Sequence, residues 1–194
     1  MSRASIVAAF VLIVASAATM ACGAPPDKEI QQAQGAIDAA RAAGAEQYAA
    51  TELAAAQDAL KQAREAVDQR DYRSALNHAL DSRERAQNAA KEAADRKATA
   101  HDDAQKALAN LTAALTEARV KLKAAESARV ASKTLAKPKQ SIADGEQALQ
   151  KARAAFAKGD YLAVTSIATP ASGRLVTVAH DLDAITAIVA RRRR

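Results

Sequence analysis

Between Gly44 and Pro138 the chain contains neither glycine nor proline, and alanine is its most frequent residue type. Alanine has the highest helix propensity, whereas glycine and proline are the residues that most often interrupt a helix. Only two phenylalanines and three tyrosines are present, and tryptophan is absent, so little aromatic area is available for a core. The sequence therefore predicts an all-α fold, an elongated alanine-rich bundle or coiled-coil-like hairpins with thin seams and little room for a deep cavity.

The chain carries one helical pattern twice, 89 residues apart. Residues 59–64, Ala-Leu-Lys-Gln-Ala-Arg, return at 148–153 as Ala-Leu-Gln-Lys-Ala-Arg, and Arg-Asp-Tyr at 70–72 returns as Gly-Asp-Tyr at 159–161. We therefore expect two related three-helix units, residues 27–100 and 101–190. In both copies the apolar positions alternate by three and four residues, as one helix face requires: Leu53, Ala56, Leu60, Ala63 and Val67, then Ile142, Gly145, Leu149, Ala152 and Phe156.

Capping residues mark the expected helices of the first unit. An N-cap at Asp27 predicts a first helix that ends at Gly44. Thr51 is the expected cap of a second helix that runs to about Gln69. A tight turn at 70–71 then starts the third helix.

The second unit has its own start and stop signals. Its first helix carries a stripe at alternating four- and three-residue spacing: Ala104, Leu108, Leu111, Leu115, Ala118, Leu122 and Ala125. Pro138 is expected to open the second helix, since proline suits a first helical turn. Gly159 is expected to end that helix, and Asp160 to cap the third.

Two places leave helix continuity open. The third helix of the first unit can run straight into the first helix of the second, giving one helix of up to about 55–60 residues, or ~80–90 Å. A break at Thr99 to Asp102 is the alternative, because either residue could cap a new helix. Pro170 and Gly173 predict a kink or break in the last helix, with a final helix over 174–190.

The segment 48–53 reads Tyr-Ala-Ala-Thr-Glu-Leu, and an Arg-Asp-Tyr turn follows at 70–72. The first unit thereby resembles a bacterial family of helical envelope domains of unknown function. That family has a Tyr-Ala-Pro-x-x-Leu helix start and a Gly-Asp-Tyr turn between alanine-rich helices. Ala50 and Arg70 stand where the family has proline and glycine.

The second unit is similar to the same family more loosely, over about residues 135–168. It keeps the proline, Pro138, and the full Gly-Asp-Tyr turn at 159–161. The family often occurs in lipoproteins and has no known active site. The resemblance therefore implies a helical envelope domain and no catalytic residue.

The single cysteine, Cys22, follows the three parts of an export signal. A charged start with Arg3 precedes an apolar run at 6–14 and small residues at 15–21. The apolar run is shorter than the ~20 residues that a membrane span needs. The sequence therefore predicts a signal peptide rather than a transmembrane anchor.

Residues 19–22, Thr-Met-Ala-Cys, resemble the lipobox of bacterial lipoproteins, with Thr19 in place of the usual leucine. This predicts a lipoprotein signal peptide over 1–21, acylation of Cys22 by diacylglycerol and a fatty acid such as palmitate, and a linker over 22–26. Secretion with a free cysteine is the alternative. Gly23, rather than the aspartate that often signals inner-membrane retention, favours the periplasmic face of the outer membrane.

The formal net charge of +6 is concentrated at the C-terminus, where Arg191 to Arg194 form a basic tail. Both signs are interspersed over the remaining chain, which is typical of a solvated helical surface and not of a nucleic-acid-binding face. The tail is expected to be a solvated terminus. Contact with anionic envelope polymers or lipid head groups is the alternative, because arginine pairs well with phosphate.

The three histidines do not predict a metal site. His78 with Asp81, and His180 with Asp183, have a three-residue spacing that offers two ligands each, whereas zinc needs three or four. Residues 101–103, His-Asp-Asp, are consecutive and would diverge around a helix. We expect surface histidines and capping aspartates, with no metal ion and no cofactor.

Catalytic signatures are also missing from the sequence, which contains no nucleophile elbow, zinc-protease motif or phosphate-binding loop. Tyr72 and Tyr161 occupy equivalent turn positions; corner packing is expected for both, and a paired binding surface is the alternative. No catalytic residue is predicted.

The sequence thus predicts a non-catalytic lipoprotein of the cell envelope with a structural or adaptor role. Acyl chains on Cys22 would hold it to a membrane, and its helical body would contact an envelope protein or peptidoglycan. Neither nucleic acid nor a small-molecule substrate is expected. The alternative is an envelope accessory protein that binds a soluble ligand or a metal ion.

Overall fold

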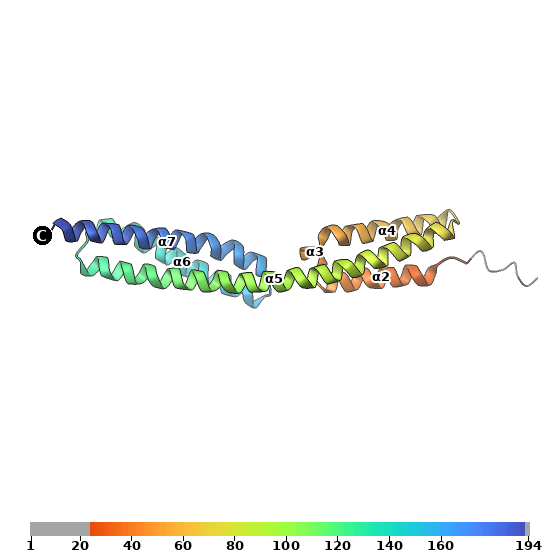
Figure 1. Cartoon of the computed structure of the whole chain (residues 1–194), viewed down its shortest axis with the longest axis horizontal. Helices are drawn as coiled ribbons and strands as arrows, with labels where there is room; N and C mark the ends of the chain where they lie inside the picture. The colour runs from red at the N-terminus through yellow and green to blue at the C-terminus, as the bar shows by residue number, and fades with distance from the viewer. Residues whose placement is uncertain (1–23, 193–194) are drawn as a thin grey trace, which may run out of the picture. The chain divides into compact units, whose positions relative to one another are not determined.

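The computed structural model describes residues 24–192, and every regular element in that range is an α-helix (Figure 1). The helices are α2 (Asp27–Ala42), α3 (Ala45–Tyr48), α4 (Ala50–Asp68), α5 (Tyr72–Ser127), α6 (Ser132–Ala157) and α7 (Tyr161–Arg192). The predicted all-α fold is confirmed. The signal peptide predicted over 1–21, Cys22 and the end of the arginine tail lie outside the described residues.

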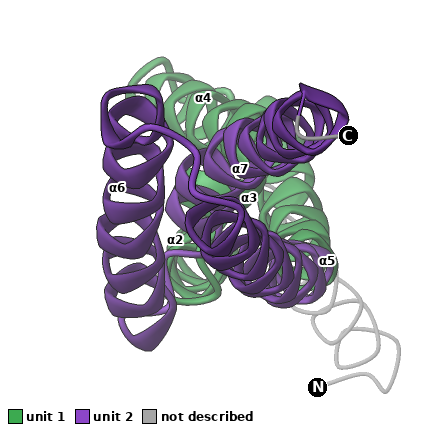
Figure 2. Cartoon of the chain, turned by 90° about the vertical axis from the view of Figure 1, so that its left-hand side faces the viewer, with its two compact units in different colours: residues 1–96 green, residues 97–194 purple. Residues whose placement is uncertain are grey.

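The chain divides into two compact units, one ending at Arg96 and the other beginning at Lys97 (Figure 2). Helix α5 supplies residues to both units and runs for 56 residues without interruption. The continuous helix is therefore the correct one of the two alternatives, and the alternative of a break at Thr99 to Asp102 is wrong. The reason is that Ala100, Ala104 and Leu111 continue one buried face past this stretch, so nothing favours a new start.

Unit 1 packs α2 and α4 against each other and against the first part of α5. Ile37, Leu53 and Leu60 are its largest buried aliphatic side chains, and alanines fill most of the remaining seam. The only buried polar residue among those described is Ser82, whose hydroxyl donates to the carbonyl of Ala56 at 2.8 Å. Such short side chains let two helix backbones approach closely.

The helix starts of unit 1 differ from those predicted. Asp27 is the first residue of α2 and Thr51 is the second residue of α4, and no side-chain hydrogen bond caps either helix. The short helix α3, which the sequence did not indicate, leads directly into α4 instead. Arg96 fixes this corner by donating to the carbonyl of Tyr48 at 2.9 Å.

The predicted turns at Gly44, 70–71 and 159–160 are confirmed. Gly44, Arg70 and Gly159 all have positive φ angles, of 93°, 62° and 76°, as helix C-termini commonly require. Asp71 then accepts a hydrogen bond from the Ser74 backbone at 3.1 Å. The bond lowers the pKa of Asp71, which therefore favours the folded state while its carboxylate is ionised.

The corresponding turn in unit 2 has the same geometry. Asp160 accepts a hydrogen bond from the backbone of Ala163 at 3.1 Å, as Asp71 does from Ser74. Both aspartates thereby satisfy a free N–H group at the start of a helix.

Unit 2 is a three-helix bundle of the second part of α5 with α6 and α7 (Figure 1). The stripe predicted on its first helix faces the core, with Leu108 and Leu122 partly buried. A second cluster around Leu135 and Leu182 closes the far end of the bundle. Leu135 explains why the predicted start of α6 at Pro138 is wrong. Its burial stabilises an extra turn from Ser132, which leaves Pro138 inside the helix.

The break predicted at Pro170 and Gly173 is also wrong, because α7 is continuous from Tyr161 to Arg192. Proline removes one intrahelical hydrogen bond and costs about 3 kcal/mol in a helix interior. Pro170 itself is exposed, but Ala168 and Ala171 on either side of it are buried in the core. This packing offsets the cost of the proline and keeps the helix continuous. One face of α7 stays buried throughout: Val164, Ala168, Ala171, Leu175, Ala179 and Leu182.

The 89-residue offset also relates buried positions of α5 in unit 1 to buried positions of α7. The pairs are Ala75 and Val164, Ala79 and Ala168, Ser82 and Ala171, Ala86 and Leu175, and Ala93 and Leu182. The larger side chain lies in unit 2 in three of these pairs. The two units therefore bury the same helix face, but the buried side chains on that face are larger in unit 2 at these three positions.

Gly145 marks the closest approach of α6 and α7. A Cβ atom at this position would lie 2.8 Å from Leu175 Cδ1, closer than van der Waals contact allows. Leu175 is only 1% exposed and has little space to move. At the positions of the 89-residue offset, unit 1 instead has alanine at both Ala56 and Ala86.

Substitution of the two seam leucines tests the assigned core. Leu60→Ala and Leu149→Ala should each lower the free energy of unfolding by roughly 2–5 kcal/mol, because each leaves a cavity in a closely packed seam. Urea denaturation would measure the loss. The control is Leu162→Ala, since Leu162 is 47% exposed and its truncation should cost about 0.5 kcal/mol or less. Equal midpoints for all three variants would contradict the assignment.

The close approach at Gly145 gives a second prediction. Gly145→Ala should lower the free energy of unfolding by about 1–3 kcal/mol through overpacking against Leu175. Gly173→Ala is the matched control in the same unit, since its added Cβ would meet nothing within 4 Å beyond its chain neighbours and the nearby backbone of its own helix, and it should stabilise α7 by up to about 1 kcal/mol. A stabilising effect of Gly145→Ala in thermal denaturation would show that the helices are less tightly packed here.

Candidate functional site

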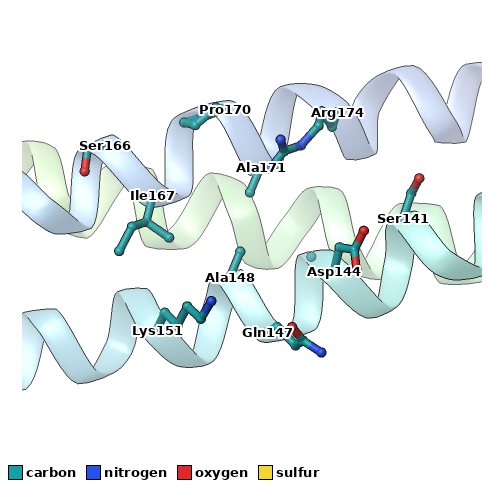
Figure 3. Close-up of a pocket in the computed structure, with 11 residues that line it drawn as sticks. Ser141, Asp144, Gln147, Ala148, Lys151, Ser166, Ile167, Pro170, Ala171 and Arg174 are labelled. Carbon is teal, nitrogen blue, oxygen red and sulfur yellow. The ribbon is translucent and has the colours of Figure 1, made fainter.

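A groove of about 500 Å³ runs between α6 and α7 in unit 2. Its lining residues span 141–151 on α6 and 166–174 on α7, which is two to three helical turns, or on the order of 15 Å. Figure 3 shows Ala148, Ile167 and Ala171 pointing into the space between the two helices. The groove is therefore long and shallow, with a floor of small apolar side chains.

Charged side chains border this floor. Lys151 extends from α6, and Arg174 runs back along α7 towards Ala171 (Figure 3). The one carboxylate in the lining is Asp144, which accepts a hydrogen bond from the amide of Gln140 at 2.8 Å. The lining therefore has two basic side chains and one acidic one, an excess of one positive charge. Among the described residues, no ion pair involves Lys151 or Arg174.

An aromatic cluster covers the turn at the start of α7. The ring of His101 lies 5.0 Å from that of Tyr161, edge to face, and 5.4 Å from that of Phe156. The Phe156 and Tyr161 rings are also 5.4 Å apart, within the range of favourable aromatic contact. The corner packing expected for Tyr161 is thus observed.

The role of His101 in this cluster was missed by sequence reasoning. His101 belongs to α5, more than fifty positions from its ring partners, and no local pattern links them. In unit 1, the position that corresponds to Phe156 by the 89-residue offset holds Val67. The tyrosine corners of the two units are therefore not chemically equivalent.

The two carboxylates that lie three residues after a histidine contact basic side chains instead. Asp81 binds Arg85 at 2.9 Å rather than His78, and Asp183 binds Lys121 at 2.6 Å. The hydrogen bond that Lys121 donates to Asp183 raises the pKa of Lys121. His180 is well exposed on α7. In the described range, no three His, Cys, Asp or Glu side chains are grouped as metal ligands would be.

Helix α7 has the length and hydropathy that a membrane-spanning helix needs. By length and composition it is the one helix within residues 24–192 that could cross a membrane, with a mean hydropathy of 1.2 over its most apolar stretch. Apolar helices at the core of water-soluble bundles have the same properties, and α7 packs one whole face into unit 2. Arg191 and Arg192 are exposed at its end.

Comparison with known proteins gives one family match, which covers most of the first unit and the next few residues of α5. Residues 28–105 match the profile of a domain of unknown function, DUF4398. No curated protein matches the chain, and neither does any solved structure. The DUF4398 region contains α2, α3, α4 and the first part of α5. The resemblance of the first unit to a helical domain of unknown function is therefore confirmed over the matched residues, and the α6–α7 groove lies beyond them.

Proposed function

We propose that this protein is a non-catalytic lipoprotein of the cell envelope with a structural or adaptor role. The observation that carries the proposal is the position of Cys22, directly after a charged start, an apolar run and a small-residue segment. Acyl chains on Cys22 would anchor the protein, and Gly23 favours the outer membrane. The helical units would then reach an envelope protein or peptidoglycan from the periplasmic face.

Features of the described residues support an adaptor role. The hollows on unit 2 are open grooves along helices, such as that between α6 and α7, and a groove of this form suits an extended partner better than a small substrate. The DUF4398 match adds a helical domain without an assigned activity. The arginine tail would add attraction to anionic surfaces, which is screened over about 8 Å at physiological salt.

We also propose that the two units are copies of one ancestral unit. Three features recur at the same 89-residue offset: the left-handed residues Arg70 and Gly159, the capping aspartates that follow them, and the buried face of the next helix. The second copy then provides a surface that can diverge while the first keeps its packing.

The lipid anchor is tested by Cys22→Ser. This variant should remain an unprocessed precursor and should not incorporate a labelled fatty acid in cells, because serine offers no thiol for acylation. Thr19→Leu is the control, since it restores the usual lipobox residue and should leave labelling intact. A processed Cys22→Ser protein that stays in the membrane pellet after carbonate extraction would place the anchor elsewhere.

The adaptor role is tested by photo-crosslinking in intact cells. A photoreactive residue at exposed Gln62 in unit 1 or Gln147 in unit 2 should give adducts of defined mass with an envelope protein or with peptidoglycan. The same positions in Cys22→Ser, which is not anchored at the outer membrane, serve as the control and should lose these adducts. Adducts with lipid alone at both positions would contradict the adaptor role.

A further inference from the structure

Arg85 in unit 1 and Arg174 in unit 2 are related by the 89-residue offset. Arg85 is held by two carboxylates: its Nε atom lies 2.9 Å from Asp81 Oδ2, and its Nη1 atom lies 4.0 Å from Glu52 Oε2. The hydrogen bond and charge of Asp81, followed by the charge of Glu52, raise the pKa of Arg85. In unit 1 the positive charge of this arginine is therefore balanced by one carboxylate from its own helix, α5, and one from α4.

Unit 2 keeps the arginine and lacks both carboxylates. The positions that correspond to Asp81 and Glu52 hold Pro170 and Ser141, and both residues line the α6–α7 groove beside Arg174. The position of Gln62 in unit 1 is Lys151 in unit 2, which adds a second cation to the same groove. The arginine that is paired within unit 1 therefore lies, in unit 2, in an open groove lined by two basic side chains and one carboxylate, Asp144.

The floor of the groove restricts what can bind beside these cations. Gly145 and Ala171 are buried, and Ala148 and Ile167 are half-buried, so an occupant would lie on a mostly apolar floor. The guanidinium group of arginine presents a planar fork of donors that matches a carboxylate. The length of the groove, on the order of 15 Å, exceeds a single small anion and suits a few turns of a peptide helix.

We propose that the α6–α7 groove of unit 2 binds an acidic peptide segment of a partner protein. One carboxylate of that segment would occupy the place beside Arg174 that Asp81 and Glu52 occupy beside Arg85, and another would pair with Lys151. Two observations favour carboxylates as the ligand. The groove has an excess positive charge, and the corresponding arginine of unit 1, Arg85, is paired with carboxylates. The inference deepens the proposed adaptor role and rests on it in the cell, whereas the binding itself requires no lipid anchor.

The test uses the purified full-length protein in detergent solution and a blocked alanine-based peptide with two glutamates four residues apart. Titration followed by NMR should shift the amide signals of Gly145, Ala148 and Ala171. The same peptide with glutamines in place of the glutamates should bind much more weakly. Arg174→Gln should weaken binding of the acidic peptide about fivefold, which corresponds to ~1 kcal/mol for an exposed ion pair.

Two further variants control for folding and for charge. Arg85→Gln removes the equivalent but internally paired arginine and should leave peptide binding unchanged. The double variant Ser141→Glu with Pro170→Asp rebuilds the unit 1 carboxylates around Arg174. It should bind the peptide as weakly as Arg174→Gln, although its thermal midpoint should rise because a proline leaves the helix interior.

Several outcomes would overturn the proposal. Equal affinity of the glutamate and glutamine peptides, or unchanged affinity in Arg174→Gln, would show that the cations do not bind carboxylates. Tighter Arg174-dependent binding of inorganic phosphate or of solubilised peptidoglycan fragments than of the acidic peptide would replace the peptide as the ligand. Because this assay is done in solution, its failure leaves the lipidation experiment on Cys22 unaffected, and the reverse also holds.

Discussion

The close approach of helices along alanine and glycine seams is the constraint on which the structure depends. Alanine loses no side-chain entropy on folding, but each buried alanine also removes little apolar area from water. The bundle therefore relies on many small contacts that must all be made at short range. The contact of Gly145 with Leu175 and the hydrogen bond from Ser82 to the Ala56 carbonyl are two forms of the same geometry. In both, one helix presents its backbone directly to its neighbour.

Much of the fold could be predicted because these seams repeat along the sequence. The stripe from Leu53 to Ala63 and its counterpart from Ile142 to Ala152 face the cores as predicted. Gly44 and Gly159 also end helices where expected, and Asp71 and Asp160 lie at the expected helix starts, whereas Asp27 does not cap α2. Each of these signals is local, since spacing, left-handed backbone and caps are determined within a few residues.

The errors arose where tertiary packing outweighed a local signal. Pro138 and Pro170 read as helix boundaries, yet the burial of Leu135 and of the α7 face around Ala171 keeps both helices intact. Thr51 has a good capping side chain, but α3 and the hydrogen bond from Arg96 determine the start of α4 instead. A single sequence gives no energy for such long-range contacts, so their effect could not be anticipated.

The candidate groove was beyond sequence reasoning for a related reason. Arg174 has no motif around it, and its significance depends on knowing that Arg85 lies between Asp81 and Glu52. The comparison needs a three-dimensional contact in one unit and a missing counterpart in the other. By contrast, Cys22 needs only its position in the chain, which is why the anchor could be predicted while the partner surface could not.

The continuity of α5 has a thermodynamic consequence for both units. From Ala94 to Thr99 all six residues are exposed, so apart from the hydrogen bond of Arg96 to the Tyr48 carbonyl this part of the helix is supported by its own backbone bonds and not by a core. Helix formation is cooperative, and an interruption in mid-helix creates two new frayed ends. We therefore expect that melting of one unit removes the support at one end of the shared helix, so that the stabilities of the two cores are linked through α5.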